Sequence, residues 1–494
     1  MAFSHLDDPL SDVHQTVVIG GGPAGLTAAY EIQKLGGEGY RPIVLEAGDL
    51  VGGIARTESH KGYRFDIGGH RFFTKVPEVE AFWNEIAGDE FLTRPRQSRI
   101  YFEGKYFDYP LKAMNALSNL GPIEAVRIMA SYARWTVAPH RTEDNLEQWV
   151  TNRFGKALYE RFFKTYTEKV WGIPCTEIGA DWAAQRIKNL SLMKAAINAF
   201  TGANDTVSLI EEFQYPRLGP GQMWELCRDR INDAGGEVRM RTAARTIHRS
   251  DQRVTGVTAT SADGEEHLIP AETVVSSMPL RELMHAFDPP PPPHVLAAAD
   301  ALKYRDFLIV TLVLDYPDPF PDNWIYVHSP DVQVGRIQNF RAWSPDMVPN
   351  DTTASIGMEY FCHEGDGLWR MDDADLIALA ASELETLGLA QTTTAIDGKV
   401  IRQPKAYPVY DRVYRDAVAT IQEWIETLEN FWTVGRNGLH RYNNQDHSQL
   451  TAMLAAQAVV TGEYRDVWNV NVERSYHETF QIEDKAAASS SSSS

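Results

Sequence analysis

The sequence predicts a multi-domain α/β fold, in which one mixed domain is assembled from separated stretches of the chain. Three observations predict it. A strand rich in β-branched residues runs into a glycine turn and a small-residue helix between Val17 and Gly36. Strand and helix patterns of the same kind return near residues 215–279 and 431–461. Between these later stretches, residues 308–360 alternate polar and apolar positions, which predicts antiparallel strands.

The first glycine turn predicts a dinucleotide site of the Rossmann type. Gly20 permits the tight turn, Gly22 lets backbone N–H groups approach a pyrophosphate, and Gly25 lets the helix pack against the strand. The helix N-terminus adds the positive end of its dipole. A second strand ends in Glu46, where a carboxylate can accept both hydroxyls of an adenosine ribose. Together these features make the prediction stronger than a lone glycine motif would.

A second glycine pair distinguishes between the dinucleotides. Gly52 and Gly53 follow Glu46 closely, and Arg56 comes three residues later. An NAD domain has no need of these residues. A protein that buries FAD lengthwise needs close backbone approach and a guanidinium to offset phosphate charge. FAD is therefore the predicted cofactor, and the spacing resembles the flavoprotein superfamily of amine oxidases, protoporphyrinogen oxidases, phytoene desaturases and UDP-galactopyranose mutases.

Composition sets limits on partners and setting. The chain has 494 residues, too many for one ordinary core, and its net charge of −20 argues against nucleic acid and anionic membrane surfaces as partners. An anionic ligand would need a local cluster of arginines. Three scattered cysteines, Cys175, Cys227 and Cys362, indicate reduced core thiols in a cytoplasmic protein without a metal site. The sequence shows no signal peptide and no apolar run long enough to span a membrane.

The chain divides, on this interpretation, into interleaved domains. The Rossmann-like FAD-binding domain is discontinuous, a mainly helical insert and an antiparallel substrate-domain sheet interrupt it, and the serine-rich end forms a flexible tail. The predicted ranges are 14–100, 210–285 and 425–480 for the FAD-binding domain, 101–209 for the helical insert, 286–424 for the sheet and 486–494 for the tail.

Within the superfamily, several segments resemble UDP-galactopyranose mutase, especially its eukaryotic form. The late block is the most specific of them, although its tyrosine-to-NQ spacing is shorter by two residues. The matching segments are GGHRFF (68–73), YTEKVWGIP (166–174), RIQNFRAWSP (336–345), AYP (406–408) and GRNGLHRYNNQDHS (435–448).

The resemblance implies how FAD and substrate would be bound. It places the backbone at Gly69 and the catalytic His70 beside the isoalloxazine and the backbone of Ala244 against the adenine. It also places Gly435, Asn444 and Gln445 along the flavin. The implied substrate-binding residues are Arg336 and Arg436, which would grip a diphosphate and serve in catalysis, Tyr407 and Tyr442, which would hydrogen-bond its phosphates, and Trp171.

Chemical reasoning from the residues agrees in outline and leaves alternatives open. Two guanidinium forks match the two charges of a diphosphate, although surface ion pairing explains either arginine alone equally well. His70 is flanked by glycines that permit close approach, but it is also compatible with a core position. Asp446 and His447 could form an acid/base pair; helix capping is the preferred interpretation. Tyr109 lies in an aromatic segment that could stack on a base.

Two enzyme classes remain as hypotheses. The resemblance favours a mutase that interconverts the pyranose and furanose forms of a nucleoside diphosphate sugar, through attack of reduced flavin N5 on the anomeric carbon. The alternative is an FAD-dependent oxidase or desaturase acting on an apolar substrate, with the arginines as structural ion pairs. A non-enzymatic scaffold is disfavoured by the histidine loop. The lining of the cavity beside the flavin distinguishes the two enzymes, because convergent Arg and Tyr favour the mutase.

Overall fold

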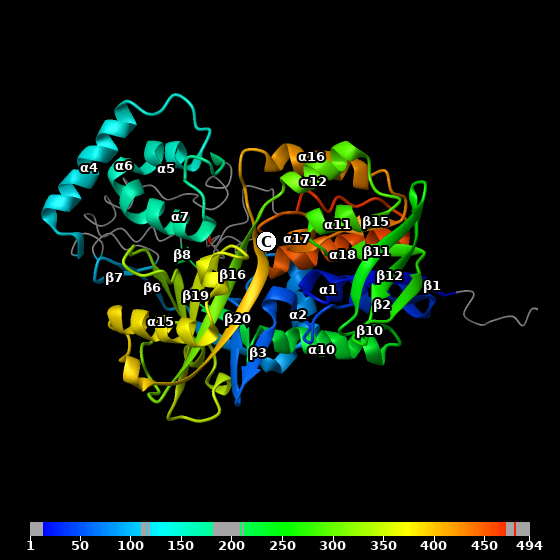
Figure 1. The fold of residues 1–494 in the computed structure, drawn as a ribbon, viewed down its shortest axis with the longest axis horizontal. Helices are drawn as coiled ribbons and strands as arrows, with labels where there is room; N and C mark the ends of the chain where they lie inside the picture. Colours follow the sequence, from blue (N-terminus) through cyan, green and yellow to red (C-terminus); the bar gives the residue numbers. More distant parts are fainter. Residues whose placement is uncertain are drawn as a thin grey trace, which may run out of the picture.

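The computed structural model describes residues 13–109, 115, 119–180, 208–209, 212–470 and 479–480. Figure 1 shows two large sheets side by side, with helices above each of them. The sheet in the right half of the view is parallel, and its strands come from distant parts of the chain. In spatial order they are β10 (Glu237–Arg239), β2 (Tyr40–Leu45), β1 (His14–Ile19), β14 (Thr273–Ser276) and β21 (Phe431–Thr433). The predicted α/β class is confirmed.

Three helices pack around this parallel sheet. They are α1 (Pro23–Gly36), α10 (Pro220–Asp233) and α18 (Gln445–Thr461). Helices α1 and α18 lie against each other along their lengths, although about four hundred residues separate them in sequence. Helix α1 can lie close to its partners because alanines and glycines occupy much of its length, and its buried residues reach 0% exposure at Leu26, Ala28 and Ala29. A four-stranded sheet covers this domain further, with β13 (Glu266–Pro270), β12 (Arg253–Thr260), β11 (Ala243–Ser250) and β15 (Phe287–Asp288).

The sheet in the left half of the view has seven strands and is largely antiparallel. In spatial order these are β20 (Ala395–Pro408), β16 (Tyr304–Leu314), β19 (Ala354–Cys362), β18 (Arg336–Asn339), β17 (Trp324–Val327), β6 (Ser98–Phe102) and β7 (Lys105–Asp108). The last two strands come from a much earlier part of the chain, and β6 pairs in parallel with β17. Strand β6 crosses the predicted boundary between the FAD-binding domain and the helical insert, and β7 lies within the predicted insert.

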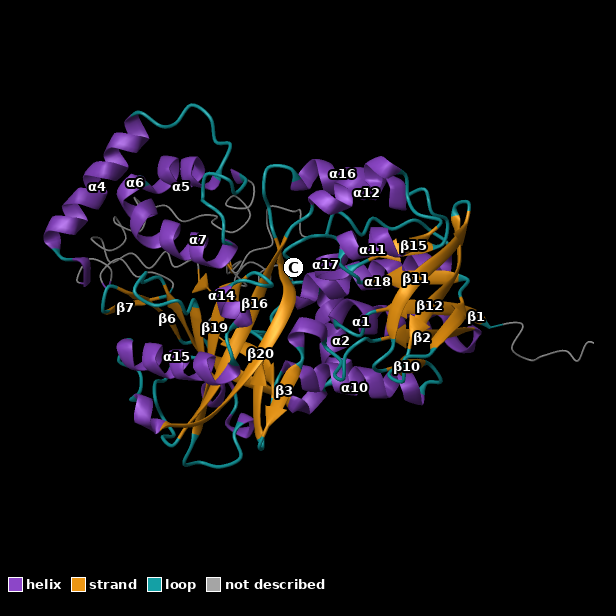
Figure 2. Cartoon of the chain, in the orientation of Figure 1, coloured by secondary structure: helices purple, strands orange, loops and turns teal. Residues whose placement is uncertain are grey.

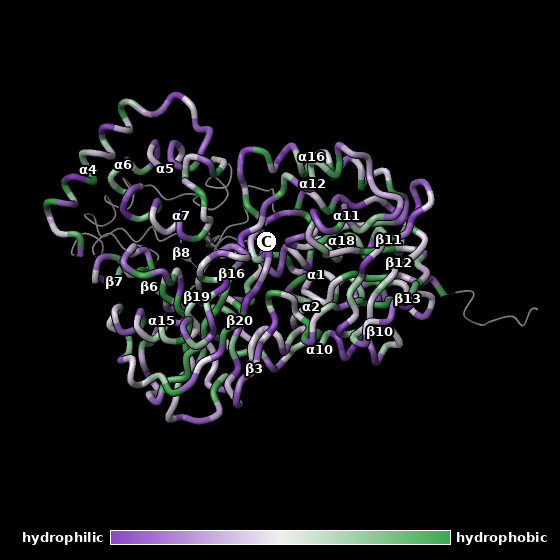
Figure 3. Tube along the Cα trace, in the orientation of Figure 1, coloured by the Kyte–Doolittle hydropathy of each residue, from purple (hydrophilic) through white to green (hydrophobic). Residues whose placement is uncertain are grey.

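The two faces of this sheet have different roles. Because side chains alternate along a strand, one face carries the apolar residues that pack on helix α15 (Asp373–Thr386), among them Leu308, Ile337 and Met358. Figure 3 shows apolar stretches along these strands. The pairing register places Arg336 and Gln338 on the opposite face. The same face carries Phe307, Glu359, Phe361, Trp324, Tyr326 and Tyr407.

Helices cover the end of the seven-stranded sheet (Figure 1). They are α4 (Pro122–Val137), α5 (Leu146–Phe154), α6 (Lys156–Leu158) and α7 (Thr165–Trp171). A turn of π-helix, Tyr159–Lys164, separates α6 from α7. Such turns are rare in proteins, and many of those that occur lie at functional sites. The exact domain limits stay a prediction, and the serine-rich tail lies outside the described residues.

Candidate active site

The first glycine turn has the backbone geometry that the sequence predicts. Gly20 has a φ of +102°, which favours glycine. A Cβ added to Gly25 would lie 1.8 Å from the carbonyl oxygen of Gly20, so α1 can approach β1 this closely only with glycine at this position. Gly22 caps α1 without a side-chain hydrogen bond, and this leaves the helix N-terminus for an anion.

The second glycine pair packs directly on the first turn. Gly52 donates its N–H to the carbonyl of Gly21 at 2.8 Å, and a Cβ added to Gly22 would lie 3.7 Å from the Cα of Gly53. Gly53 has a φ of +56°. The two turns therefore approach each other backbone to backbone, which forms a narrow cradle beside the N-terminus of α1.

Arg56 holds the second turn in place. Its guanidinium donates to the carbonyl of Gly53 at 2.9 Å and to the side-chain oxygen of Gln403 at 2.7 Å, and its Nε lies 2.7 Å from Glu58. These contacts tie the glycine turn to strand β20 of the other sheet. Direct neutralisation of a phosphate by Arg56 stays a prediction.

Glu46 ends strand β2 beside the first glycine turn. One carboxylate oxygen accepts the N–H of Gly21 and the other accepts the N–H of Gly48, each at 2.7 Å. These bonds fix the carboxylate at the carboxyl end of β2. Each oxygen keeps a second lone pair for a ribose hydroxyl. Ala244 is the second residue of strand β11 and lies nearby, since Thr242 donates its N–H to the carbonyl of Glu46 at 2.8 Å. A cavity of about 320 Å³ borders Ala244.

We expect Glu46→Ala to weaken FAD binding, because the variant loses the acceptor of both ribose hydroxyls. Hydrogen bonds to a charged group contribute about 1.5–3 kcal/mol, so the dissociation constant rises roughly tenfold to a hundredfold. Fluorescence titration of apoprotein with FAD measures the change. Glu38→Ala, in an exposed short helix beyond α1, is the matched control. Unchanged FAD affinity in Glu46→Ala would remove the residue from the ribose site.

The histidine loop lies between the two sheets. Gly68 has a φ of +104° and is buried, whereas Gly69 is exposed. Burial, together with the nearby charge of Arg436 and of Arg336, lowers the pKa of His70 to about 3. The imidazole is therefore neutral at physiological pH. Its Nδ1 is buried and has no hydrogen-bond partner among the described residues.

Arg336 and Tyr407 meet on the face of the seven-stranded sheet that points away from helix α15. The guanidinium of Arg336 donates to the hydroxyl of Tyr407, and its Nε lies 2.7 Å from Glu359, which also accepts from Gln338 at 2.7 Å. Burial opposes the charge on Arg336, but Glu359 together with Tyr407, Tyr166 and Tyr442 outweighs burial, and the arginine pKa is held well above its usual value. Burial raises the pKa of Tyr407 to about 12, so its hydroxyl stays protonated.

Arg436 reaches the same place from the opposite domain. Its Nε donates to the carbonyl of Ala406 at 2.9 Å and its Nη1 to that of Asn443 at 3.1 Å. The guanidinium lies 4.9 Å from the ring centre of Tyr407 and 4.1 Å from that of Tyr442. The two tyrosine rings are stacked, with centres 5.6 Å apart. The structure thus brings together both predicted arginines and both predicted tyrosines.

Trp171 closes one side of this group. The centre of its ring system lies 6.1 Å from Tyr407 and 5.9 Å from Tyr442, and it stacks on Tyr410 at 6.3 Å. Tyr109 lies beside Tyr326, the strand partner of Arg336, rather than in the group of Tyr407, Tyr442 and Trp171. It contacts Tyr326 at 5.0 Å, with the guanidinium of Arg96 5.3 Å from its ring. A stacking role for Tyr109 stays a prediction.

The N-terminus of α18 completes the site residues that the sequence singled out. Asn444 is exposed at the N-cap, and Gln445 is buried and accepts from the indole of Trp224 at 3.1 Å. The side-chain nitrogen of Gln445 is buried without a hydrogen-bond partner among the described residues. Gly435 anchors the preceding turn, since its N–H donates to Thr451 at 2.9 Å. Asp446 lies in the first turn of α18, in contact with His447 at 3.2 Å.

These residues fit an FAD molecule along the domain. The narrow glycine cradle suits a pyrophosphate, and the fixed carboxylate of Glu46 suits a ribose. At the other end, two buried and unpartnered groups, His70 Nδ1 and Gln445 Nε2, suit the polar edge of the flavin. The individual contacts to FAD stay predictions.

Sequence reasoning missed several residues of the site. Glu359 on β19 and Tyr326 on β17 are the register partners of Arg336, and Gln338, two residues after Arg336 on the same strand, donates to Glu359. Tyr166, in the quoted YTEKVWGIP segment, stacks on His328 with ring centres 4.4 Å apart. The available signal was Glu359, a charged residue within the largely apolar strand β19.

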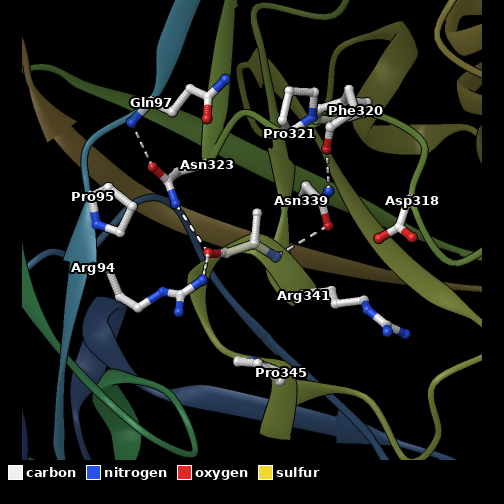
Figure 4. A pocket seen from close by; sticks show the side chains of 11 residues that line it. Arg94, Pro95, Gln97, Asp318, Phe320, Pro321, Asn323, Asn339, Arg341 and Pro345 are labelled. Atoms are coloured by element: carbon white, nitrogen blue, oxygen red, sulfur yellow. Dashed lines mark hydrogen bonds between the residues drawn. The ribbon is translucent and has the colours of Figure 1, made fainter.

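A second cavity, of about 340 Å³, lies where strands β6 and β17 begin and β18 ends (Figure 4). Its polar side chains are engaged with backbone. Asn323 bonds to Gln97 and to the carbonyl of Ala342, and Arg94 donates to the same carbonyl at 2.8 Å. None of the predicted site residues lines it.

Two further searches concern metals and membranes. Within the described residues, no group of three or more His, Cys, Asp or Glu side chains could hold a metal ion. No described helix has both the length and the apolar character needed to cross a bilayer. Cys175, Cys227 and Cys362 are buried free thiols.

The fold and the glycine cradle define a flavoprotein, and its cofactor is FAD. Residues 23–400 match the model of the flavin containing amine oxidoreductase family, and the chain belongs to that family. The predicted superfamily is thereby confirmed.

Individual relatives point to more than one activity. A coproporphyrinogen III oxidase of Mycobacterium leprae is 24% identical over 429 residues, which cover 82% of this chain and 90% of the relative. A putative flavin-containing monoamine oxidase of Mycobacterium tuberculosis is 25% identical over 56% of this chain and 60% of the relative.

Solved structures share the fold. The crystal structure of reduced UDP-galactopyranose mutase superimposes with a TM-score of 0.80 at 20% identity, covering 94% of this chain and 98% of that one. A putative protoporphyrinogen oxidase from Exiguobacterium gives a TM-score of 0.68 at 16% identity, covering 91% and 99%. At these identities the likeness establishes the fold alone.

Proposed function

We propose that this FAD-dependent enzyme is a mutase that interconverts the pyranose and furanose forms of a nucleoside diphosphate sugar. One observation carries the proposal. Arg336 and Arg436 come from different domains and converge on the stacked pair Tyr407 and Tyr442, in the neighbourhood of His70. An apolar substrate would have no use for two partly buried guanidinium groups.

The charges of the site support an anionic substrate. Arg336 is paired with Glu359, whereas Arg436 donates only to backbone carbonyls and forms no ion pair with a described residue. The charge of Arg336 is balanced by Glu359. The charge of Arg436 has no balancing carboxylate within this group. A diphosphate supplies the missing negative charge, and planar guanidinium forks match its oxygen atoms.

The chain's own residues would carry out binding and orientation. When bound, reduced FAD supplies the nucleophile that displaces the diphosphate from the sugar. Arg336 and Arg436 stabilise the charge on the departing diphosphate and retain it for the return step. Tyr407 donates its protonated hydroxyl, and Trp171 with Tyr442 excludes water from the reacting sugar. Neutral His70 orients groups at the flavin edge without adding charge.

An FAD oxidoreductase is the second candidate. The names of the relatives in sequence favour it, since they are oxidases. The same arginines would then bind acidic groups of an oxidisable substrate rather than a leaving diphosphate. Both candidates use the same arginines, so the reaction itself has to distinguish them.

The proposal is tested by incubating dithionite-reduced enzyme anaerobically with UDP-galactose, UDP-glucose and the corresponding dTDP sugars. We expect at least one sugar to equilibrate with its furanose form, which proton NMR identifies from the anomeric coupling. Oxidised enzyme serves as the control and leaves every sugar unchanged. The mutase proposal is wrong if no sugar changes ring form while an oxidisable substrate yields peroxide in proportion to product.

A further inference from the structure

Lys169 on helix α7 binds the loop between β17 and β18 through its backbone carbonyls. The Nζ donates to the carbonyls of Ser329 at 2.8 Å, Val332 at 2.9 Å and Val334 at 3.1 Å. The carbonyl of Val327 lies further away, at 3.4 Å. An ammonium has three N–H groups, so the three short contacts use all of them.

A buried carboxylate holds the same loop from the other side. Glu383 on α15 accepts the N–H of Gln333 at 2.6 Å and that of Val334 at 3.0 Å. The hydroxyl of Tyr360 donates to the same carboxylate at 3.0 Å. Glu383 is only 6% exposed. The loop therefore lies between a cation and an anion, each bound to the backbone groups of complementary polarity.

This arrangement compensates two buried charges without direct contact between them. A buried charge is costly unless hydrogen bonds or an opposite charge replace its hydration. Here the peptide groups of residues 329–334 replace it for both Lys169 and Glu383. Loss of either side chain leaves the loop backbone groups that it bound without their partner. Order in the loop thus depends on both residues.

The loop leads directly to the substrate site. Val334 contacts both charges and lies two residues before Arg336. The intervening Gly335 bonds to the backbone of Glu359 at 2.8 Å and to that of Val327 at 2.9 Å. On the other side, α7 carries Trp171 at its end, two residues after Lys169. Lys169 therefore connects the aromatic wall of the site to the strand that carries one of its arginines.

We propose that Lys169 and Glu383 together are positioning residues, which fix the β17–β18 loop and so hold Arg336 and Trp171 in register for an anionic substrate. The inference rests on the proposed function only in taking a nucleoside diphosphate as the ligand of Arg336. The fixing of the loop is a separate statement about the protein and can be measured without any ligand.

Chemical rescue tests the proposal. Lys169→Ala removes the carbons and nitrogen that propylammonium can replace. We expect the variant to bind UDP about tenfold more weakly in calorimetry, and propylammonium chloride to restore most of the affinity. Tetramethylammonium has the same charge but no N–H donor, and we expect no rescue from it. Lys164→Ala, an exposed lysine five residues earlier, is the matched control. FAD content and melting temperature verify folding.

A second measurement keeps the inference independent of the ligand. Hydrogen–deuterium exchange in peptides covering 328–336 increases in Lys169→Ala and in Glu383→Gln, and propylammonium reduces it only in the lysine variant. The double variant should show less than the sum of the two effects on exchange, because both act on one loop. Lys169→Arg retains a cation, so the 328–336 peptides should exchange more slowly in this variant than in Lys169→Ala.

The outcomes separate the two proposals. Unchanged exchange in both single variants, or a loss that no primary ammonium reverses, would overturn the positioning role. If exchange behaves as expected but the wild type binds no nucleoside diphosphate, the positioning role stands and the proposed function fails. If UDP binds the wild type and Lys169→Ala equally well, the loop has no part in holding Arg336 and the inference is wrong.

Discussion

Arg436→Ala is expected to weaken the binding of UDP far more than the binding of FAD. Arg436 forms no ion pair with a described residue, so a bound diphosphate would be its main charge partner. Truncation of one member of a buried, hydrogen-bonded charge pair costs about 2–5 kcal/mol, which corresponds to roughly thirtyfold to several thousandfold in the dissociation constant. Isothermal titration calorimetry with UDP, on FAD-loaded protein, measures the loss.

Arg336→Ala should weaken UDP binding by a similar amount, but for two reasons. Its removal also leaves Glu359 buried without its partner, and burial already raises the pKa of that carboxyl group. The double variant Arg336→Ala/Glu359→Gln separates the two causes, because it removes the unpaired charge as well as the arginine. Stability should recover in the double variant, whereas UDP affinity should stay low.

A matched arginine controls for general loss of positive charge. Arg253 is 55% exposed and makes only a 3.6 Å contact with the exposed Glu429, so Arg253→Ala should bind UDP as the wild type does. Arg436→Lys should recover part of the affinity, since it restores the charge without the planar fork. If Arg436→Ala binds UDP like the control, the diphosphate clamp is wrong and the oxidoreductase candidate is favoured.

The local parts of the cofactor site were predictable from the sequence. The glycine turns follow from short-range backbone requirements, and the structure gives Gly20, Gly52 and Gly53 the positive φ angles that such turns use. Glu46 follows from its place at the end of a strand. Each of these predictions needs only a short stretch of chain, because one strand, one turn and one helix fix the geometry.

The partners of the substrate site were not predictable in the same way. Glu359 faces Arg336 only because β18 and β19 pair in one particular register. Lys169 meets the β17–β18 loop only after a helix from the middle of the chain has packed over a later sheet. Arg336 and Arg436 were found through resemblance of motifs, since charge and spacing alone left surface ion pairing open.

The helical insert shows a related limit. The sequence predicts a mainly helical region from residue 101, yet β6 and β7 at residues 98–108 extend the seven-stranded sheet. Their partner, β17, lies more than two hundred residues later. A pair of short strands gives a weak local signal, and its place in a sheet depends on a distant strand with a free edge.

The expected result that best separates a mutase from an oxidoreductase is the number of electrons consumed in each turnover. With a nucleoside diphosphate sugar that is a substrate, catalysis should require reduced FAD and yet consume no reductant, because pyranose and furanose forms are isomers. Under anaerobic conditions, two electrons per flavin, supplied by one molecule of dithionite, should support many turnovers. An oxidoreductase behaves differently, since each turnover transfers a pair of electrons to an acceptor and the flavin must be reoxidised before the next.

The two behaviours are measured in one experiment. Reduced enzyme is mixed with the sugar in a sealed cuvette, flavin absorbance reports its redox state, and NMR of quenched samples reports ring form. Admission of oxygen should stop the mutase as the flavin absorbance returns, and a second addition of dithionite should restart it. Arg436→Ala, reduced in the same way, is the control for catalysis by free reduced flavin and should show little conversion. Turnover that continues in oxygen with one peroxide per product, and stops when oxygen is exhausted, would assign the chain to the oxidoreductases.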